Sequence, residues 1–454
     1  MKPNIYLMLY AILTAQFLTS CDQLLETDIP ANQLSANLVF ESPQTADAAL
    51  AGLYAGLYDQ SPLSGDASGA LLSYYTDDLL YLSQSNPTFS AFYTNQLLPG
   101  NTMIENYWNQ AYQKIYYANA IIEGTSLSPA LGEAQKKRLT GEALVARAIL
   151  YTYLVQVFGD IPYPTATDYR VNQNLPKMTT QQIYEQITQD LNRAHDLLED
   201  TYRHAERIYP NKTVALFLLA RVQMLRKQWG AAETSLATVI NNPLYVFQEN
   251  ISKVFDKSGQ HILWQLKPLN NNDPTKEAQV YYFTGIPTVN ALNPDLINSF
   301  SSEDVRKQEW TTAVSTTGIT WYRANKYKNR TNNLNEYSIV IRLEEAYLMM
   351  AEVLAHQDRL AEALPYLNRI RQRAGLAAIT SVTDKEHLLT IITDEFRKEF
   401  FTEGGQRFFV LKRMDLLETL LPVKPHWKSY HRRWPIPQRE LLQNANLLPQ
   451  NDGY

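Results

Sequence analysis

One stretch of the sequence decides the fold, and it reads IRLEEAYLMMAEVLAHQDRLAEALPYLNRIRQRAG over residues 341–375. Apolar and small residues recur in it at intervals of three and four, which is the period of an amphipathic helix. The Asp358-Arg359 pair interrupts this period, so the stretch predicts two helices, at 341–356 and 360–374, joined by a turn. Small residues such as Ala351 let two helix backbones approach closely, so we expect the two helices to pack together.

A second helix pair of the same tetratricopeptide kind is predicted at 215–224 and 231–240. The remaining predictions are a first helix that Ser42 caps and Pro43 opens, helices at 107–123, 133–158, 180–198, 212–227, 229–241 and 385–403, and a brief strand at 261–266. Irregular stretches at 61–101 and 242–338 interrupt the array, so the chain is not a plain solenoid. We therefore expect a mainly α-helical single domain over 21–454, in which tetratricopeptide-like helix pairs form a scaffold for two long insertions.

The only cysteine of the 454 residues is Cys21, and it follows a short apolar stretch at 5–18. A lysine at the start and a short apolar middle predict a secretory signal, because the stretch is too short to span a bilayer. The tetrapeptide at 18–21, Leu-Thr-Ser-Cys, resembles the lipobox of bacterial lipoproteins. This resemblance implies a signal peptide over 1–20 and a lipid on the Cys21 thiol. The alternative is an ordinary cleaved signal whose last residue happens to be cysteine.

Composition argues against nucleic-acid binding and against catalysis. The formal net charge is −5, and the longest basic runs, at 136–138 and 432–433, are short. No HExxH, GxSxG, GxGxxG or Walker pattern occurs, and the seven histidines lack ligand spacing. Asp77-Asp78 and Glu344-Glu345 nominally offer a glycosidase two carboxylates, but adjacent acids point to different helix faces. We expect no enzyme, no metal site and no cofactor.

Motifs in a fixed order cover nearly the whole chain after the cysteine. They are Tyr107-Trp108 with Tyr112, Gly141-Glu142-Ala143 with Arg147-Ala148, Phe-Gly-Asp-Ile-Pro at 158–162, the helix pair at 342–375, 395–399, Arg407-Phe408-Phe409, Pro-Ile-Pro-Gln-Arg-Glu at 435–440, and 450–454. Together they resemble the SusD/RagB family, the surface lipoproteins of Bacteroidetes. The chain departs from the family pattern at 410–414, where it has Val-Leu-Lys-Arg-Met instead of Asp-Leu-Arg-Arg-Trp. These positions look structural, as does Trp108.

The resemblance implies a function at the cell surface. It implies an outer-membrane protein that a lipid alone anchors, facing the cell exterior, which captures an oligosaccharide and delivers it to a SusC-like TonB-dependent transporter. The ligand-contacting loops vary most within the family, so the resemblance does not identify the glycan. Two alternatives remain open: a peptide-binding member of the same family, and a scaffold whose helix pairs present a groove to another protein.

Candidate ligand contacts follow from the chemistry of sugars. A sugar offers flat C–H patches and a rim of hydroxyls, so its site needs aromatic faces beside Asp, Asn or Arg. The candidates are Tyr74, Asp77, Asp78, Tyr81, Asn86, Phe89 and Tyr93 in the first insertion, and Tyr282, Trp321, Tyr322 and Arg323 in the second. The polar turn at 316–318 favours exposure of the last three. In the alternative, Tyr74, Asp78 and Tyr81 share a helical face and only pack and cap, and Trp321 is buried in the core.

Overall fold

The computed structural model describes residues 36–83 and 85–454. Its helices begin and end at residues with recognisable local signals. Helix α3 (Pro43–Asp59) begins after Ser42, whose hydroxyl accepts a hydrogen bond from the Thr45 amide. Helix α9 (Thr180–Leu197) begins with a capping box, and α7 (Glu133–Phe158) ends at Gly159, whose φ of +80° suits glycine. The predicted signal peptide and the predicted lipid site at Cys21 lie outside the described residues.

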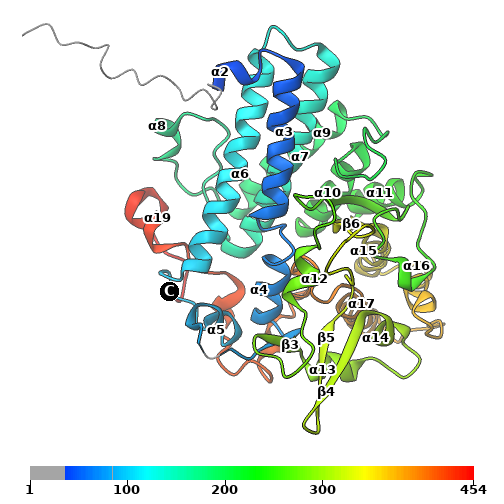
Figure 1. Cartoon of the computed structure of the whole chain (residues 1–454). Coiled ribbons are helices and arrows are strands. Elements are labelled where there is room, and N and C mark those ends of the chain that lie inside the picture. The colour runs from blue at the N-terminus through cyan, green and yellow to red at the C-terminus, as the bar shows by residue number, and fades with distance from the viewer. Residues whose placement is uncertain (1–35, 84) are drawn as a thin grey trace, which may run out of the picture.

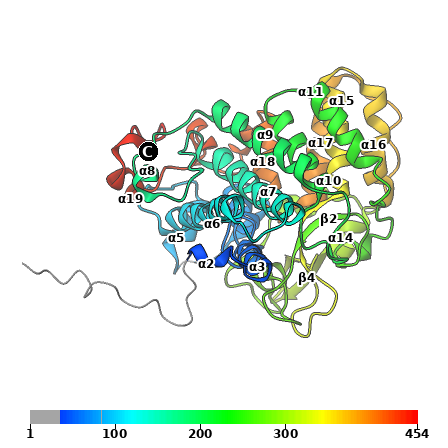
Figure 2. The ribbon, with the colours of Figure 1, turned by 90° about the horizontal axis from the view of Figure 1, so that it is seen from above.

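Long helices form one array in which each helix packs on the next. Besides α7 and α9, its members are α6 (Thr102–Leu127), α10 (Lys212–Leu225), α11 (Trp229–Ile240), α15 (Leu343–His356), α16 (Leu360–Arg373) and α17 (Lys385–Phe400). Helix α11 packs directly against α15, so the array resumes after the second insertion (Figures 1 and 2). The mainly helical fold is therefore confirmed, and α7, which is buried on every side over 139–158, lies at its centre.

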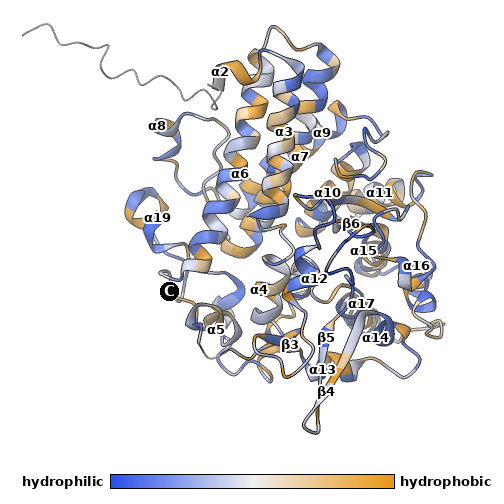
Figure 3. Cartoon of the chain, viewed as in Figure 1, coloured by the Kyte–Doolittle hydropathy of each residue, from blue (hydrophilic) through white to orange (hydrophobic). Residues whose placement is uncertain are grey.

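Shorter elements complete the chain. The helices are α2 (Ala36–Val39), α4 (Ser68–Tyr75), α5 (Pro87–Tyr93), α8 (Tyr169–Asn172), α12 (Lys276–Val280), α13 (Pro294–Ser299), α14 (Val305–Trp310), α18 (Gln406–Arg413) and α19 (Gln438–Gln443). The strands are β1 (Leu79–Tyr81), β2 (Ile262–Leu266), β3 (Asn290–Leu292), β4 (Thr311–Thr316), β5 (Ile319–Ala324) and β6 (Ser338–Arg342). They pair antiparallel as β1–β3, β2–β6 and β4–β5. Hydrophobic and hydrophilic residues alternate along the surface helices (Figure 3). No described helix is long and apolar enough to span a membrane.

Three sequence-based expectations are wrong in detail. The helix expected from residue 341 begins at Leu343, because Ile341 and Arg342 pair with Trp264 and Ile262 in a sheet. The helix expected to reach 403 ends at Phe400, since the backbone of Thr402 turns to a φ of +60°. Neither long stretch is wholly irregular: 61–101 contains α4, β1 and α5, with every residue of α4 buried, and 242–338 contains β2, α12, β3, α13, α14, β4 and β5.

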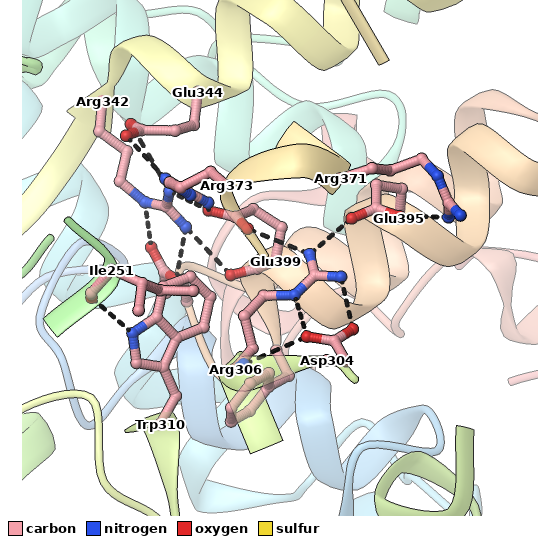
Figure 4. Close-up of polar contacts among 12 residues, drawn as sticks. Ile251, Asp304, Arg306, Trp310, Arg342, Glu344, Arg371, Arg373, Glu395 and Glu399 are labelled. Carbon is pink, nitrogen blue, oxygen red and sulfur yellow. Dashed lines mark hydrogen bonds and ion pairs between the residues drawn. The ribbon is translucent and has the colours of Figure 1, made fainter. Parts of the chain in front are cut away.

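A buried network of ion pairs joins α14, α15, α16 and α17 to the strand β6 (Figure 4). Glu399 on α17 lies at its centre, with one carboxylate oxygen 2.5 Å from both Arg342 and Arg373 and the other 3.2 Å from Arg306. Burial raises the pKa of the Glu399 carboxyl, but the three guanidinium groups outweigh it and hold that pKa well below its usual range. Since α14 continues directly into β4, this network fixes the base of the β4–β5 hairpin.

Candidate ligand-binding face

A short sheet brings the two insertions together. Tyr81 on β1 lies opposite Asn290 on β3, although the two residues are about two hundred positions apart in the chain. The Leu82 amide donates to the Val289 carbonyl at 2.8 Å. Strand β3 also lies beside β5, so β1, β3 and β5 are neighbours at the lower end of the molecule in Figure 1. The candidate residues of both insertions therefore lie at the same end of the fold.

The β4–β5 hairpin presents Trp321 and Arg323 on one side. The two residues are two positions apart on β5, so their side chains point to the same face. The Arg323 guanidinium carbon lies 4.1 Å from the centre of the Tyr282 ring, and its Nη1 donates to the Phe283 carbonyl at 2.6 Å. Arg330 covers the same ring at 3.4 Å. Hydrogen bonding by Arg323, and then by Arg330, lowers the pKa of the Tyr282 hydroxyl.

A second aromatic group comes from the first insertion. The rings of Tyr81 and Phe89 stack with their centres 6.1 Å apart, and both are half-buried. Asn86 is the cap of α5, since its side-chain oxygen accepts hydrogen bonds from the Thr88 and Phe89 amides. We use the name candidate face for Tyr81, Phe89, Tyr282, Trp321, Arg323 and Arg330. Tyr322 and Tyr93 are half-buried beside it and pack against the core.

The structure places three predicted contacts in the interior instead. Tyr74 is buried, and its hydroxyl accepts a hydrogen bond from Asn290 at 3.0 Å. Asp77 forms ion pairs with Arg407 at 2.8 Å and with Arg397 at 3.1 Å. Asp78 also pairs with Arg397 at 3.1 Å and is 1% exposed. Direct ligand contact by these three residues is therefore not supported, and the packing alternative holds for Tyr74 and Asp78; the two carboxylates pair with the partly buried guanidinium groups of Arg397 and Arg407.

Arg330 and Lys424 are residues of this region that the sequence did not reveal. Lys424 Nζ donates to the Tyr74 carbonyl at 2.7 Å and to the Tyr93 carbonyl at 2.9 Å, so it ties α4 to α5. Burial lowers the pKa of Lys424 to about 7. Backbone carbonyls leave no trace in side-chain patterns, so a lysine that binds them cannot be recognised from the sequence. Arg330 stands in a polar stretch with no periodic pattern to mark its role.

An interior cavity lies between α12, β5 and β6. Its water-accessible volume is about 40 Å³, enough for a few water molecules, and its lining includes Glu277, Lys326 and Tyr281. The Ser338 hydroxyl donates to the Glu277 carboxylate at 2.8 Å. Burial nevertheless raises the pKa of Glu277 to about 7, so this carboxyl holds its proton far more tightly in the folded protein than in the unfolded chain.

We expect Glu277→Gln to stabilise the protein above pH 7. The folded protein favours the protonated Glu277 carboxyl. The contribution of this carboxyl to the free energy of unfolding is therefore fully present below about pH 4.5 and is lost as the pH rises through about 7. Each pKa unit corresponds to about 1.4 kcal/mol, so the gain in unfolding free energy from Glu277→Gln at pH 8 is at most about 3 kcal/mol. Urea unfolding at pH 5, 6, 7 and 8 measures the difference. Glu386→Gln, at an exposed position of α17, should show no such trend, and a flat difference for Glu277→Gln would contradict the expectation.

Comparisons with known proteins cover both halves of the chain. A family model described as starch-binding and associating with the outer membrane matches residues 26–224, and a model of the SusD family matches residues 265–430. The SusD-like protein P2 of Formosa agariphila is 26% identical over 96% of this chain and 97% of its own length. A SusD-like protein of Bacteroides ovatus is 23% identical over 86% of this chain and 79% of its own length.

Solved structures agree with these sequence matches. A SusD superfamily protein from Bacteroides vulgatus has a TM-score of 0.78 at 19% identity and covers 91% of this chain and 100% of its own. Surface glycan-binding protein A from Bacteroides thetaiotaomicron, solved in complex with laminarihexaose, has a TM-score of 0.76 at 17% identity over 90% of this chain and 99% of its own. These structural matches establish the fold. With the two family models, they show that the chain belongs to the SusD/RagB family of non-catalytic binding proteins.

Proposed function

We propose that this protein binds a glycan at the candidate face and delivers it to a SusC-like TonB-dependent transporter. The pairing of β1 with β3 carries the proposal, because it gathers aromatic side chains from two distant insertions at one end of a rigid helical body. Relatives with this fold include a laminarin-binding SusD-like protein and a surface glycan-binding protein that holds laminarihexaose. The proposed site has the two kinds of group that a sugar needs.

The first kind of group is a flat apolar surface. Trp321 is partly exposed and offers a ring face against which the C–H groups of a sugar can pack, whereas Arg323 and Arg330 lie over the Tyr282 ring. The second kind is a fixed donor. Within the described chain, no carboxylate lies within 4 Å of the Arg323 or Arg330 guanidinium, so their N–H groups are not neutralised by ion pairs. Arg323 is held in place by the Phe283 carbonyl, which limits the entropy lost when a hydroxyl binds to it.

The transporter and the lipid anchor belong to the same proposal. Membership of the family supports delivery to a SusC-like partner, and a lipid on Cys21 would hold the body at the outer membrane without a membrane-spanning helix. A SusC-like gene beside this one, and retention of this protein when its product is purified, would support the partner. A peptide ligand is the alternative that the binding experiment must separate.

Replacing Trp321 by alanine should weaken glycan binding by about tenfold or more, because truncation of an aromatic anchor at the centre of a site costs at least about 1–2 kcal/mol. Isothermal titration with laminarihexaose, maltohexaose and a casein peptide digest measures the affinity. Thr320→Ala is the matched control, since Thr320 is exposed on the opposite side of the same strand. Equal affinities for the two variants, or a preference for peptides over both sugars, would reject the proposal.

A further inference from the structure

A groove of about 630 Å³ opens on another side of the molecule, between α6, the segment 162–173 and α19. Figures 1 and 2 both place α8 and α19 at the left edge, away from the β4–β5 hairpin, so the groove is separate from the candidate face. Its volume lies within the range of about 300–1,000 Å³ that is usual for small-ligand sites. No role for this groove follows from the proposed function.

One wall of the groove is an aromatic stripe on α6. Trp108, Tyr112 and Tyr116 are four residues apart, so they lie on one face of the helix. Trp108 is buried and confirms its predicted structural role, whereas Tyr116 is 47% exposed. The Tyr112 hydroxyl donates to the Pro162 carbonyl at 2.8 Å. The ring that is left open to a ligand is therefore that of Tyr116.

The other walls are also held in place. The side chain of Asn119 donates to the Pro164 carbonyl at 3.0 Å, and that of Asn444, just after α19, donates to the Leu175 carbonyl at 2.9 Å. Tyr169, the first residue of α8, is 72% exposed and lines the groove on the side of the 162–173 segment. These bonds join all three walls, so the groove exists before any ligand binds.

The polar groups in the groove select the kind of ligand. Among the described residues, the side chains of Asn109, Gln173 and Gln443 have no hydrogen-bond partner, so they are available to hydroxyl groups. Glu440 brings a carboxylate into the lining, and the lining contains no lysine or arginine. A sulfated or phosphorylated ligand would meet negative charge without a counter-ion, and a purely apolar ligand would leave the amides unpaired.

We propose that this groove is a second binding site, for a neutral oligosaccharide, with Tyr116 and Tyr169 as its stacking faces and the unpaired amides as its hydroxyl partners. Two sites on one rigid body would let a long glycan bind at both. The second contact is then intramolecular, which raises the overall affinity for the polymer without a new contact at either site.

The experiment uses the full mature chain in a Trp321→Ala background, so that binding at the candidate face is already weakened. Laminarihexaose and maltohexaose are titrated into this protein and into three further variants that carry Tyr116→Ala, Tyr169→Ala or Tyr117→Ala. Tyr117 is the control, because it is the next residue on α6 and is 41% exposed but does not line the groove. Exposed tyrosines contribute little to the core, and circular dichroism confirms the fold of each variant.

We expect Tyr116→Ala and Tyr169→Ala to reduce the remaining affinity by about tenfold, and Tyr117→Ala to change it by less than about twofold. Equal effects of all three variants, or complete loss of binding in the Trp321→Ala background alone, would overturn the second site while leaving the candidate face intact. The reverse pattern, with groove variants that lose binding and a Trp321→Ala variant that does not, would support the groove and reject the candidate face. Failure of both sugars to bind the wild-type chain would reject both proposals.

Discussion

Glu399→Gln should lower the free energy of unfolding by about 3–5 kcal/mol, the cost of removing one partner from a buried ion pair. Three buried arginines, Arg306, Arg342 and Arg373, share this carboxylate. Glutamine has nearly the same shape but no charge, so all three buried guanidinium groups would lose their common counter-ion. Urea unfolding followed by circular dichroism measures the change.

Glu362→Gln is the matched control for this substitution. Glu362 also pairs with an arginine, at 2.6 Å from Arg359, but its side chain is 59% exposed. Solvent screens such a pair, so we expect a loss of less than about 1 kcal/mol. Similar losses for the two variants would mean that the buried network does not hold its five elements together. Because Arg306 lies on α14, which runs into β4, Glu399→Gln should also weaken glycan binding at the candidate face.

Trp434→Ala should cost about 3–5 kcal/mol of unfolding free energy, as truncation of a fully buried tryptophan usually does. Its ring is enclosed by Phe92, Tyr107 and Tyr75, with ring centres 4.9, 5.3 and 5.9 Å away. Its backbone amide donates to the Val157 carbonyl at 2.8 Å. The Trp434 side chain therefore packs against α4, α5, α6 and α7 at once, and an alanine would leave a cavity among these four elements.

Trp229→Ala provides the comparison. Trp229 stacks on His356 at 4.1 Å on the helix array, but it is partly exposed, so a smaller loss of about 1–2 kcal/mol is expected. Thermal unfolding should rank the two variants in this order. A Trp434→Ala protein as stable as Trp229→Ala would show that the aromatic cluster collapses around the missing ring without cost.

The helices were predictable because their signals are local. The helices at 133–158 and 360–374 match α7 and α16 to within one residue, since caps, turns and apolar periodicity act over a few positions. Ile341 and Arg342 were predicted in a helix but form part of a strand, because they pair with β2, which lies nearly eighty residues earlier in the chain. No local sequence pattern indicates such a distant pairing. The burial of α4 depends in part on the same kind of distant contact, because α18, more than three hundred residues later, packs on it together with the nearby α5 and β1.

The candidate face was predictable in composition but not in detail. An insertion rich in aromatic residues indicated Tyr282, Trp321 and Arg323, and the structure brings these residues to one end of the fold. Whether an acid faces solvent or an ion pair depends on distant partners, and Asp77 meets Arg407 across more than three hundred residues. Their role in ligand binding stays a prediction until the affinities are measured.

The direct packing of α11 on α15 has a consequence for how such proteins diversify. The chain leaves the array after α11 and returns to it at almost the same place, so the intervening segment is a detour whose two ends are fixed by the scaffold. Loop-closure entropy grows slowly with length, by about 0.6 kcal/mol for each doubling. Only exposed parts of the detour, such as the tip of the β4–β5 hairpin, can therefore change in length or composition at small thermodynamic cost, because Trp264, Arg306 and Trp310 of the same segment are fixed in the core.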